Sequence, residues 1–442
     1  MAVMPVRRLL LNMAWPMMLS MLIQALYNLV DSMFVAQLST DGFVALSLAY
    51  PVQTLMISIC VGTGVGVNTI LSRRLGERRP AEASAVAMNG YFLYLCCWLI
   101  FLIPGVLFSR PFLALFSDVP QVVDYGSQYL AIVTAGSLGV CMQFSGERVL
   151  QASGDAVGPM CIQGIGAVVN LLLDPLLIFG LGPFPRLEVA GAALATVIGQ
   201  LVGMTVGLLL VRRSRVLVLQ ARGFRPSRSV ILEILKIGFP AMVMQSLATV
   251  MTLGMNKLLS FFSATGVFIL GAYFKLQSFL FMPVYGLNNG LIPVVSFNYG
   301  AKKRERITGL IHFALIIAAG LLAAGTLLLL LVPGPLLGLF NADAAVLADG
   351  VPALRLVSLS FVFAAVGIIF SSSFQALDCP MLSLILSLLR QVVLLLPAAL
   401  VLGLLAPRLI WLSFLLAEGF SSLLALVLYR RLYRTKLARL EE

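Results

Sequence analysis

Charged residues are scarce in this chain of 442 residues, since Asp, Glu, Lys and Arg together make up only 11% of it. A soluble protein carries about a quarter of its residues as charged ones. Hydrophobic residues make up 60% of the chain, and its mean hydropathy is +1.02. The apolar runs are long and continuous instead of alternating with a period of two, which favours helices over a β-barrel. These features exclude a soluble globular protein and predict an all-α polytopic membrane protein.

Sequence patterns of enzymes and of ATP-driven pumps are also missing. No G-x-x-x-x-G-K-[ST] run is present, so we expect no ATP-binding loop. The glycine-rich stretch GTGVGVN (62–68) lies inside an apolar run, where glycines favour close packing or bending. The six cysteines also lie in apolar runs, without the spacing of a zinc site or a disulfide framework. We therefore predict that the protein is not an enzyme and binds no cofactor.

Twelve apolar runs are long enough to cross a membrane as helices. They cover residues 9–38, 44–71, 85–108, 127–150, 157–180, 189–211, 231–260, 267–295, 307–332, 351–374, 380–403 and 409–430.

Basic residues between these runs predict the orientation of the chain. The net charge is +12. Clusters of Lys and Arg at 7–8, 73–79, 212–228, 302–306 and 430–439 all fall on one side if twelve helices alternate. The opposite loops hold Asp41, Asp118, Asp124, Asp343 and Asp349. The positive-inside rule then places both termini in the cytoplasm. The positive charge is therefore attributed to topology and lipid headgroups, and we expect no nucleic-acid partner.

The two halves of the chain repeat with one constant offset. WP (15–16) recurs as FP (239–240), SRRLGERR (72–79) as SFNYGAKK (296–303), LALFSD (113–118) as LGLFNA (337–342), and LQA (150–152) as FQA (374–376). The offset spans six predicted helices, so the halves share one orientation and a pseudo-twofold axis along the membrane normal is expected. We predict an N-terminal six-helix lobe (1–211), a basic cytoplasmic linker (212–230) and a C-terminal six-helix lobe (231–442).

The first predicted helix carries an aspartate in the stretch ALYNLVDSMFVAQLS (25–39). Gln24, Tyr27 and Asp31 lie on one helix face, with Asn28 at its edge. A carboxylate at the bilayer centre costs roughly 3 kcal/mol on insertion scales, so such a residue is a candidate functional site. Asp31 lies roughly 33 Å above the cytoplasmic start of the helix at about 1.5 Å per residue. A solvated position near the outer surface stays open as the alternative.

The fifth and sixth predicted helices offer partners for Asp31. Asn170 and Asp174 share a face at i and i+4, and Pro175 removes one backbone hydrogen bond there. Thr196 follows in VAGAALATVIGQ, whose small residues permit close helix packing. Helix rise places all these groups in the outer half of the membrane. Oxygen ligands of this kind suit a hard cation, and two nearby carboxylates favour proton uptake. The cluster therefore predicts a site for Na⁺ or H⁺, with ordinary interhelical hydrogen bonding as the alternative.

The second half lacks such a pair of acids. Its polar candidates for a substrate cleft are Gln245, Lys275, Gln277 and Arg390. Lys275 and Arg390 either face a cleft or pair with a carboxylate. The sequence assigns no role to Lys257 or to His312, the only histidine.

The motifs ALYNLVDSMFVAQL, SRRLGERR, NLLLDPLLIFG, GAALATVIG and MPVYGLNNGLIPVVSFNYGAKK together resemble the multidrug and toxic compound extrusion (MATE) family, over nearly the whole chain. The resemblance implies two six-helix bundles and antiport of organic cations and drugs against Na⁺ or H⁺. Within the family it is nearer to the DinF-like and MepA-like members than to NorM-like ones. It implies that Asp31, Asn170, Asp174 and Thr196 form the cation site, and that Pro16 is the proline associated with helix bending.

The expected function is secondary active multidrug efflux by alternating access, in a bacterial cytoplasmic (inner) membrane. The expected partners are amphipathic or cationic drugs and membrane lipids, and the protein is expected to be monomeric. A flippase for lipid-linked precursors or polysaccharides is the alternative. Lys257, Lys275 and Arg390 keep it open, because such a protein needs a cationic cleft for pyrophosphate.

Overall fold

The computed structural model describes residues 3–38, 40–214, 216, 224–263, 265–340 and 342–441. Within these ranges, a few side chains lie outside the description: Asn28, Leu29, Asp31–Met33, Val35–Leu38, Thr40, Phe43 and Glu441.

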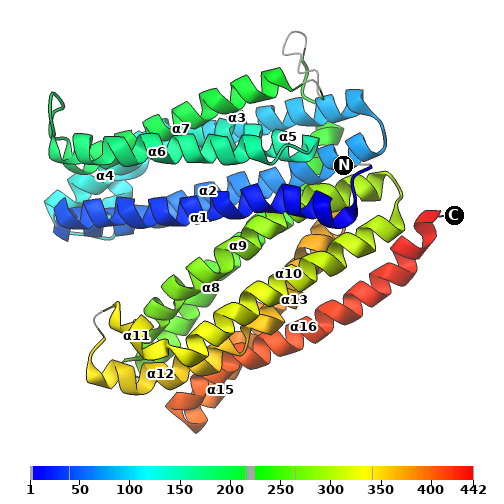
Figure 1. Ribbon diagram of the computed structural model, residues 1–442. Coiled ribbons are helices and arrows are strands. Elements are labelled where there is room, and N and C mark those ends of the chain that lie inside the picture. The colour runs from blue at the N-terminus through cyan, green and yellow to red at the C-terminus, as the bar shows by residue number, and fades with distance from the viewer. Residues whose placement is uncertain are drawn as a thin grey trace. The chain divides into compact units, whose positions relative to one another are not determined.

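Helices make up nearly all of the described chain, which contains no β-strand (Figure 1). The first seven are α1 (Val6–Leu38), α2 (Thr40–Gly76), α3 (Pro80–Ala114), α4 (Pro120–Ala135), α5 (Leu138–Ser153), α6 (Val157–Phe179) and α7 (Glu188–Arg213). They are followed by α8 (Arg228–Phe262), α9 (Gly266–Gly300), α10 (Arg304–Leu331), α11 (Pro333–Gly338), α12 (Ala344–Ser358), α13 (Phe361–Ala376), α14 (Pro380–Leu388), α15 (Leu395–Leu405) and α16 (Leu412–Leu432). A π-helical turn, Leu389–Leu394, joins α14 to α15, and short 3₁₀ and π segments flank α16 (Pro407–Trp411, Tyr433–Leu437 and Ala438–Glu441).

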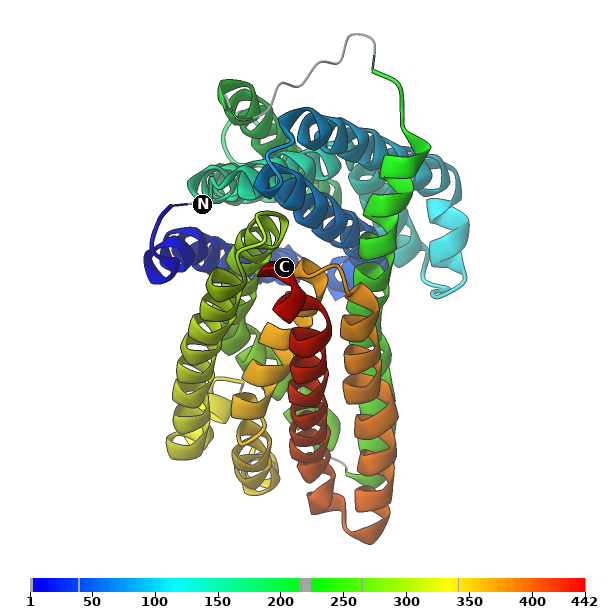
Figure 2. The ribbon, with the colours of Figure 1, turned by 90° about the vertical axis from the view of Figure 1, so that its right-hand side faces the viewer.

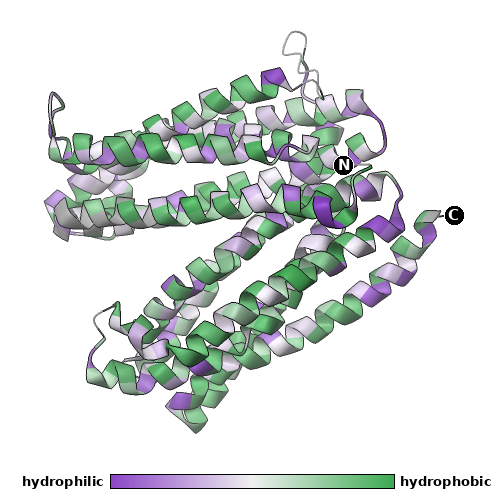
Figure 3. Ribbon diagram, in the orientation of Figure 1, coloured by the Kyte–Doolittle hydropathy of each residue, from purple (hydrophilic) through white to green (hydrophobic). Residues whose placement is uncertain are grey.

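The predicted membrane spans are confirmed. In the described chain, ten helices are long and apolar enough to cross a membrane, and two bent helix pairs bring the number to twelve. Hydrophobic residues dominate along the long helices (Figure 3). Helices satisfy every backbone hydrogen bond within one segment, which hydrocarbon requires. The protein is therefore a polytopic α-helical membrane protein.

The sequence did not predict the two bends. Helices α4 and α5 meet at 43°, and α12 and α13 meet at 45°. Each bent pair replaces a span that had been expected to be a single helix. The breaks fall at residues 136–137 and 359–360, where a short turn interrupts the helical hydrogen bonding.

The backbone confirms the internal repeat. Arg78 and Lys302, which occupy equivalent positions of the two halves, both have positive φ, at 60° and 56°. Gly154 and Asp378 form a second equivalent pair, with φ of 92° and 60°. Positive φ is uncommon outside glycine, so its recurrence at the offset of the sequence repeat shows that both halves turn in the same way.

The helices group into two compact units. The N-terminal unit comprises residues 19–239, and the C-terminal unit comprises residues 1–18 and 240–442. Helices α1 and α8 therefore each contribute residues to both units. The lobe boundaries expected at residues 211 and 231 stay a prediction.

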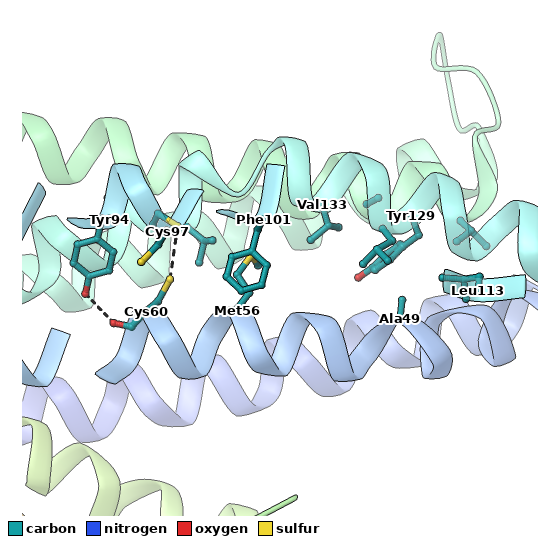
Figure 4. Packing of buried hydrophobic residues seen from close by; sticks show 14 of the residues in the cluster. Ala49, Met56, Cys60, Tyr94, Cys97, Phe101, Leu113, Tyr129 and Val133 are labelled. Atoms are coloured by element: carbon teal, nitrogen blue, oxygen red, sulfur yellow. Dashed lines mark hydrogen bonds between the residues drawn. The ribbon is translucent and has the colours of Figure 1, made fainter. Parts of the chain in front are cut away.

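Each unit has an apolar core of its own. In the N-terminal unit, Met56, Cys60, Tyr94 and Phe101 belong to a cluster between α2, α3, α4 and α5 (Figure 4). The Tyr94 hydroxyl donates a hydrogen bond to the Cys60 carbonyl at 2.9 Å. In the C-terminal unit, the long helices run side by side, with α16 next to α15 (Figure 2). There the ring of Tyr273 packs within 6.3 Å of Phe361 and within 5.5 Å of Phe414, measured between ring centroids.

Glycines bring α6 and α7 into backbone contact. A Cβ added to Gly191 would lie 2.4 Å from the carbonyl oxygen of Leu177, and one added to Gly199 would lie 2.7 Å from that of Gly166. Side chains larger than hydrogen do not fit at these distances. The two helices therefore approach closely along their length, as the small residues predicted.

We expect Gly191→Ala to destabilise the protein by about 1–3 kcal/mol, because the added methyl group overlaps a backbone carbonyl that has no room to move. Gly164→Ala in α6 is the matched control, since a Cβ there meets nothing within 4 Å. Thermal unfolding of the purified full-length variants measures the difference. Equal melting temperatures would contradict the close packing.

Candidate functional site

Three of the predicted cation-site residues lie together in the N-terminal unit. The Asn170 side-chain amide nitrogen is 3.5 Å from Asp174 Oδ1 and 3.3 Å from Thr196 Oγ1. All three residues are buried, and Asp174 is 0% exposed. The structure thus brings side chains from α6 and α7 into one polar cluster.

Local helix geometry positions this cluster. Asn170 and Asp174 are one turn apart on α6, and so they share a face. Gly199 lies three residues after Thr196 in α7. A Cβ added to Gly199 would lie 3.0 Å from the Cβ of Asn170, so the two residues are in close contact. The glycine contacts between α6 and α7 therefore bring the Thr196 hydroxyl within reach of the Asn170 amide.

The chemistry of the cluster is that of a cation or proton site. A buried carboxylate is costly unless a positive charge or a proton compensates it. The side-chain oxygen of Asn170, Oδ1, has no hydrogen-bond donor among the described residues. Carboxylate, amide and hydroxyl oxygens are the ligands that hard cations prefer. The cluster can therefore hold Na⁺ by its oxygens or a proton on Asp174.

The predicted residues of α1 are only partly placed. Asp31 and Asn28 lie in this helix, but their side chains are outside the described residues. Gln24 and Tyr27 are half-buried, and Pro16 lies inside the helix. The participation of Asp31 in the cation site stays a prediction.

The predicted cleft residues of the second half, which all lie in the described part of the chain, differ in exposure and in the contacts that they make. Gln245 of α8 and Lys275 of α9 are exposed, and the Lys275 ammonium lies 5.7 Å from the ring centroid of Phe340. Gln277 is half-buried. The two residues without an assigned role, Lys257 and His312, are also exposed.

Arg390 pairs with a carboxylate, which was one of the two interpretations of its sequence position. Its Nη1 lies 3.5 Å from Oε1 of Glu418 in α16, and the two side chains are 21% and 18% exposed. Arg390 lies in the π-helical turn Leu389–Leu394. Pro397 follows this turn and has no N–H for the carbonyl of residue 393, which accounts for the irregular backbone. π-Turns of this kind are frequent at functional sites.

Sequence reasoning missed a second buried acid. Glu147 in α5 is 1% exposed and accepts hydrogen bonds from Gln143 and Gln163. The spacing of Gln143 and Glu147, one helical turn apart, was the available signal. Glu147 and Arg148 stand near the end of the predicted span 127–150, where charged residues usually reach the interface, so this signal is weak.

A cavity of about 600 Å³ lies at the start of α4 in the N-terminal unit. Its lining includes Asp41, Gln121, Asp124, Tyr125 and Gln128. Asp124 forms an exposed ion pair with Arg110 at 3.1 Å. Asp41 lies in the first turn of α2, and the other four of these lining residues lie in α4.

Solved structures share this fold over almost the whole chain. One is described as an outward-facing conformation of a multidrug resistance MATE family transporter of the MOP superfamily. Another is described as a MOP superfamily transporter from Pyrococcus furiosus with a binding pocket of reverse polarity. Each gives a TM-score of 0.91 with 24% identity, covering 99% of this chain and 97% of the other.

Sequence relatives agree with the fold. The chain is 30% identical to an FAD transporter of Shewanella oneidensis over 89% of this chain and 88% of the relative. It is 26% identical to the multidrug export protein MepA of Staphylococcus aureus over 96% and 93% of the two chains. The sequence pattern of the MatE family matches twice, at residues 16–176 and 240–401, and the starts of the two matches are separated by the same offset as the repeated motifs. The chain belongs to the MATE family of membrane transporters.

Proposed function

We propose that the protein is a secondary active multidrug exporter that moves organic cations and other drugs out of the cell in exchange for H⁺ or Na⁺. The observation that carries this proposal is the buried cluster of Asn170, Asp174 and Thr196. A binding ion drives a conformational change only if it prefers one state. A fully buried carboxyl group supplies that preference, because its affinity for a proton or a cation changes when the surrounding helices move.

We also propose roles for two residues of α1, and a location and orientation of the protein in the membrane. Asp31 completes the cation site from α1, and Pro16 lets that helix bend. The protein lies in the bacterial inner membrane with both termini in the cytoplasm, acts as a monomer and alternates access between its two faces. The basic clusters at the ends of α2, α7 and α16 support this orientation.

The names of the relatives indicate two substrate classes to test. MepA proteins are multidrug exporters, which favours hydrophobic cations such as ethidium. The Shewanella relative is named for flavin adenine dinucleotide, an anion. The flippase alternative also requires an anion site, for pyrophosphate. The ion pair between Arg390 and Glu418 compensates the most buried basic candidate of the second half, which favours the cationic substrates.

Asp174→Asn is expected to lower ion-driven ethidium efflux by roughly tenfold or more, since losing about 1.4 kcal/mol of coupling already costs a factor of ten. The asparagine keeps the shape of the side chain, but it takes up no proton and offers a cation no negative charge. Efflux from proteoliposomes under imposed H⁺ and Na⁺ gradients measures the effect. Asp118→Asn, at an exposed acid of the loop before α4, is the matched control. Efflux by Asp174→Asn at the control rate, with unchanged ion dependence, would refute the proposed site.

Glu418→Gln alone is expected to destabilise the protein by about 3 kcal/mol, because it leaves Arg390 half-buried without its counter-charge. The double variant Arg390→Met/Glu418→Leu should recover most of this loss and keep ethidium efflux. Thermal unfolding and vesicle efflux check the two statements. If the double variant folds but transports neither ethidium nor flavin adenine dinucleotide, Arg390 serves the substrate and the structural assignment of the pair is wrong.

A further inference from the structure

Glu147 is a buried acid that the proposed cation site does not use. It lies in α5 of the N-terminal unit and is 1% exposed. Gln143 donates to Oε1 at 3.1 Å, and Gln163 of α6 donates to Oε2 at 3.2 Å. Both carboxyl oxygens are therefore occupied by amide N–H donors.

The hydrogen bonds of Glu147 continue into other helices. Ser20 of α1 donates to Oε1 of Gln163 and is itself 1% exposed. A Cβ on Gly203 of α7 would lie 2.8 Å from Oε1 of Gln143, so α7 packs directly on that amide. Residues of α5 and α6 thus contact the carboxyl group directly, and α1 and α7 contact the two amides that donate to it.

These helices include the pair that carries the Asp174 cluster. Gln163, Asn170 and Asp174 are separated by 7 and 4 residues on α6, which places them on one helix face. The distance along the axis from Gln163 to Asp174 is about 16 Å at about 1.5 Å per residue. The two acids therefore lie at two levels of the same helix interface.

The charge nearest to Glu147 is Arg148, the next residue. The Arg148 guanidinium donates to Gln151 at 2.8 Å and lies 5.8 Å from the ring centroid of Phe144. Four titratable groups of α2 and α3 face α5, namely Cys60, Tyr91, Tyr94 and Cys97. They interact with Cys141, Ser145 and Arg148 of that helix. From α6, Gln163 donates to the carboxyl group, and from α7, Gly203 packs on the Gln143 amide.

We propose that Glu147 is a second coupling carboxyl group of the N-terminal unit, which binds a proton in one conformational state and releases it in the other. This inference rests on the proposed ion-coupled export. A metal ion would need several oxygen ligands, whereas both oxygens of Glu147 face N–H donors. A proton, unlike a metal ion, needs no added space, so it can bind to a carboxyl group that is as buried as that of Glu147.

Proton binding would change the hydrogen bonds of α1. The proton forms an O–H bond on Glu147, which then becomes a donor where it had been an acceptor. One amide must turn so that its oxygen accepts this O–H, and Gln163 is the amide that Ser20 also contacts. Ser20 lies one turn after Pro16, so protonation at Glu147 reaches the residues at which α1 passes from one unit to the other. Loss of the proton to water restores the starting bonds.

The first test is infrared spectroscopy of the full-length protein in lipid bilayers, as a difference between acidic and alkaline pH. The wild type is expected to show a protonated carboxyl C=O band that Glu147→Gln removes and that Asp118→Asn leaves in place. Glu147→Asp should keep a band at a shifted frequency, which decides the matter if Glu147→Gln fails to fold. Superimposable spectra of wild type, Glu147→Gln and Glu147→Asp would overturn the proposal.

The second test counts protons with a pH-sensitive dye while ethidium leaves proteoliposomes under a proton gradient. Glu147→Gln should lose about one proton per ethidium relative to the wild type, as expected if each carboxyl group carries one proton. The same proton count in both would overturn the coupling role. A wild type that moves no substrate under any gradient would refute the proposed function instead, while the infrared bands would still decide whether Glu147 takes up a proton.

Discussion

Burying a carboxyl group in hydrocarbon costs free energy, and this cost constrains how the helices of the N-terminal unit pack around their buried acids. Lipid supplies neither hydrogen-bond donors nor counter-charge, so the protein itself must satisfy each buried acid. Asp174, at 0% exposure, meets Asn170 on its own helix, and the amide of Asn170 reaches Thr196 on the next. Only glycine-to-backbone contact between α6 and α7 places the Thr196 hydroxyl that close. The chemistry of the site therefore depends on the close packing of α6 against α7.

The two halves of the molecule share a backbone but not a charge pattern. By the offset of the repeat, Arg390 and Glu418 correspond to Gly166 and Leu194 of the first half, which lie near Asn170 and Thr196 in the sequence. In the C-terminal unit a guanidinium therefore compensates the carboxylate of the equivalent helix pair. In one half this positive charge belongs to the chain, whereas under the proposed function an exchangeable ion supplies it in the other.

The sequence predicted much of this architecture, because membrane-spanning helices can be recognised from the length and the hydropathy of apolar runs. The apolar spans, the internal repeat and the matching depth of Asn170 and Thr196 followed from apolar runs, recurring motifs and helix rise. The bends between α4 and α5 and between α12 and α13 did not, since a local break inside an apolar run leaves the hydropathy unchanged. Glu147 was missed for a related reason. Its burial depends on Gln163 of another helix and on the packing of α7, which no local pattern reveals.

The most direct measurement is ethidium flux by the wild-type protein in proteoliposomes with a proton gradient, a sodium gradient or neither, all at the same membrane potential. If a buried carboxyl site couples ion binding to transport, one of the two gradients drives accumulation of ethidium against its own gradient, and the vesicles without a gradient only equilibrate. Equal flux in all three conditions would contradict ion-coupled export and, with it, the role assigned to Asp174.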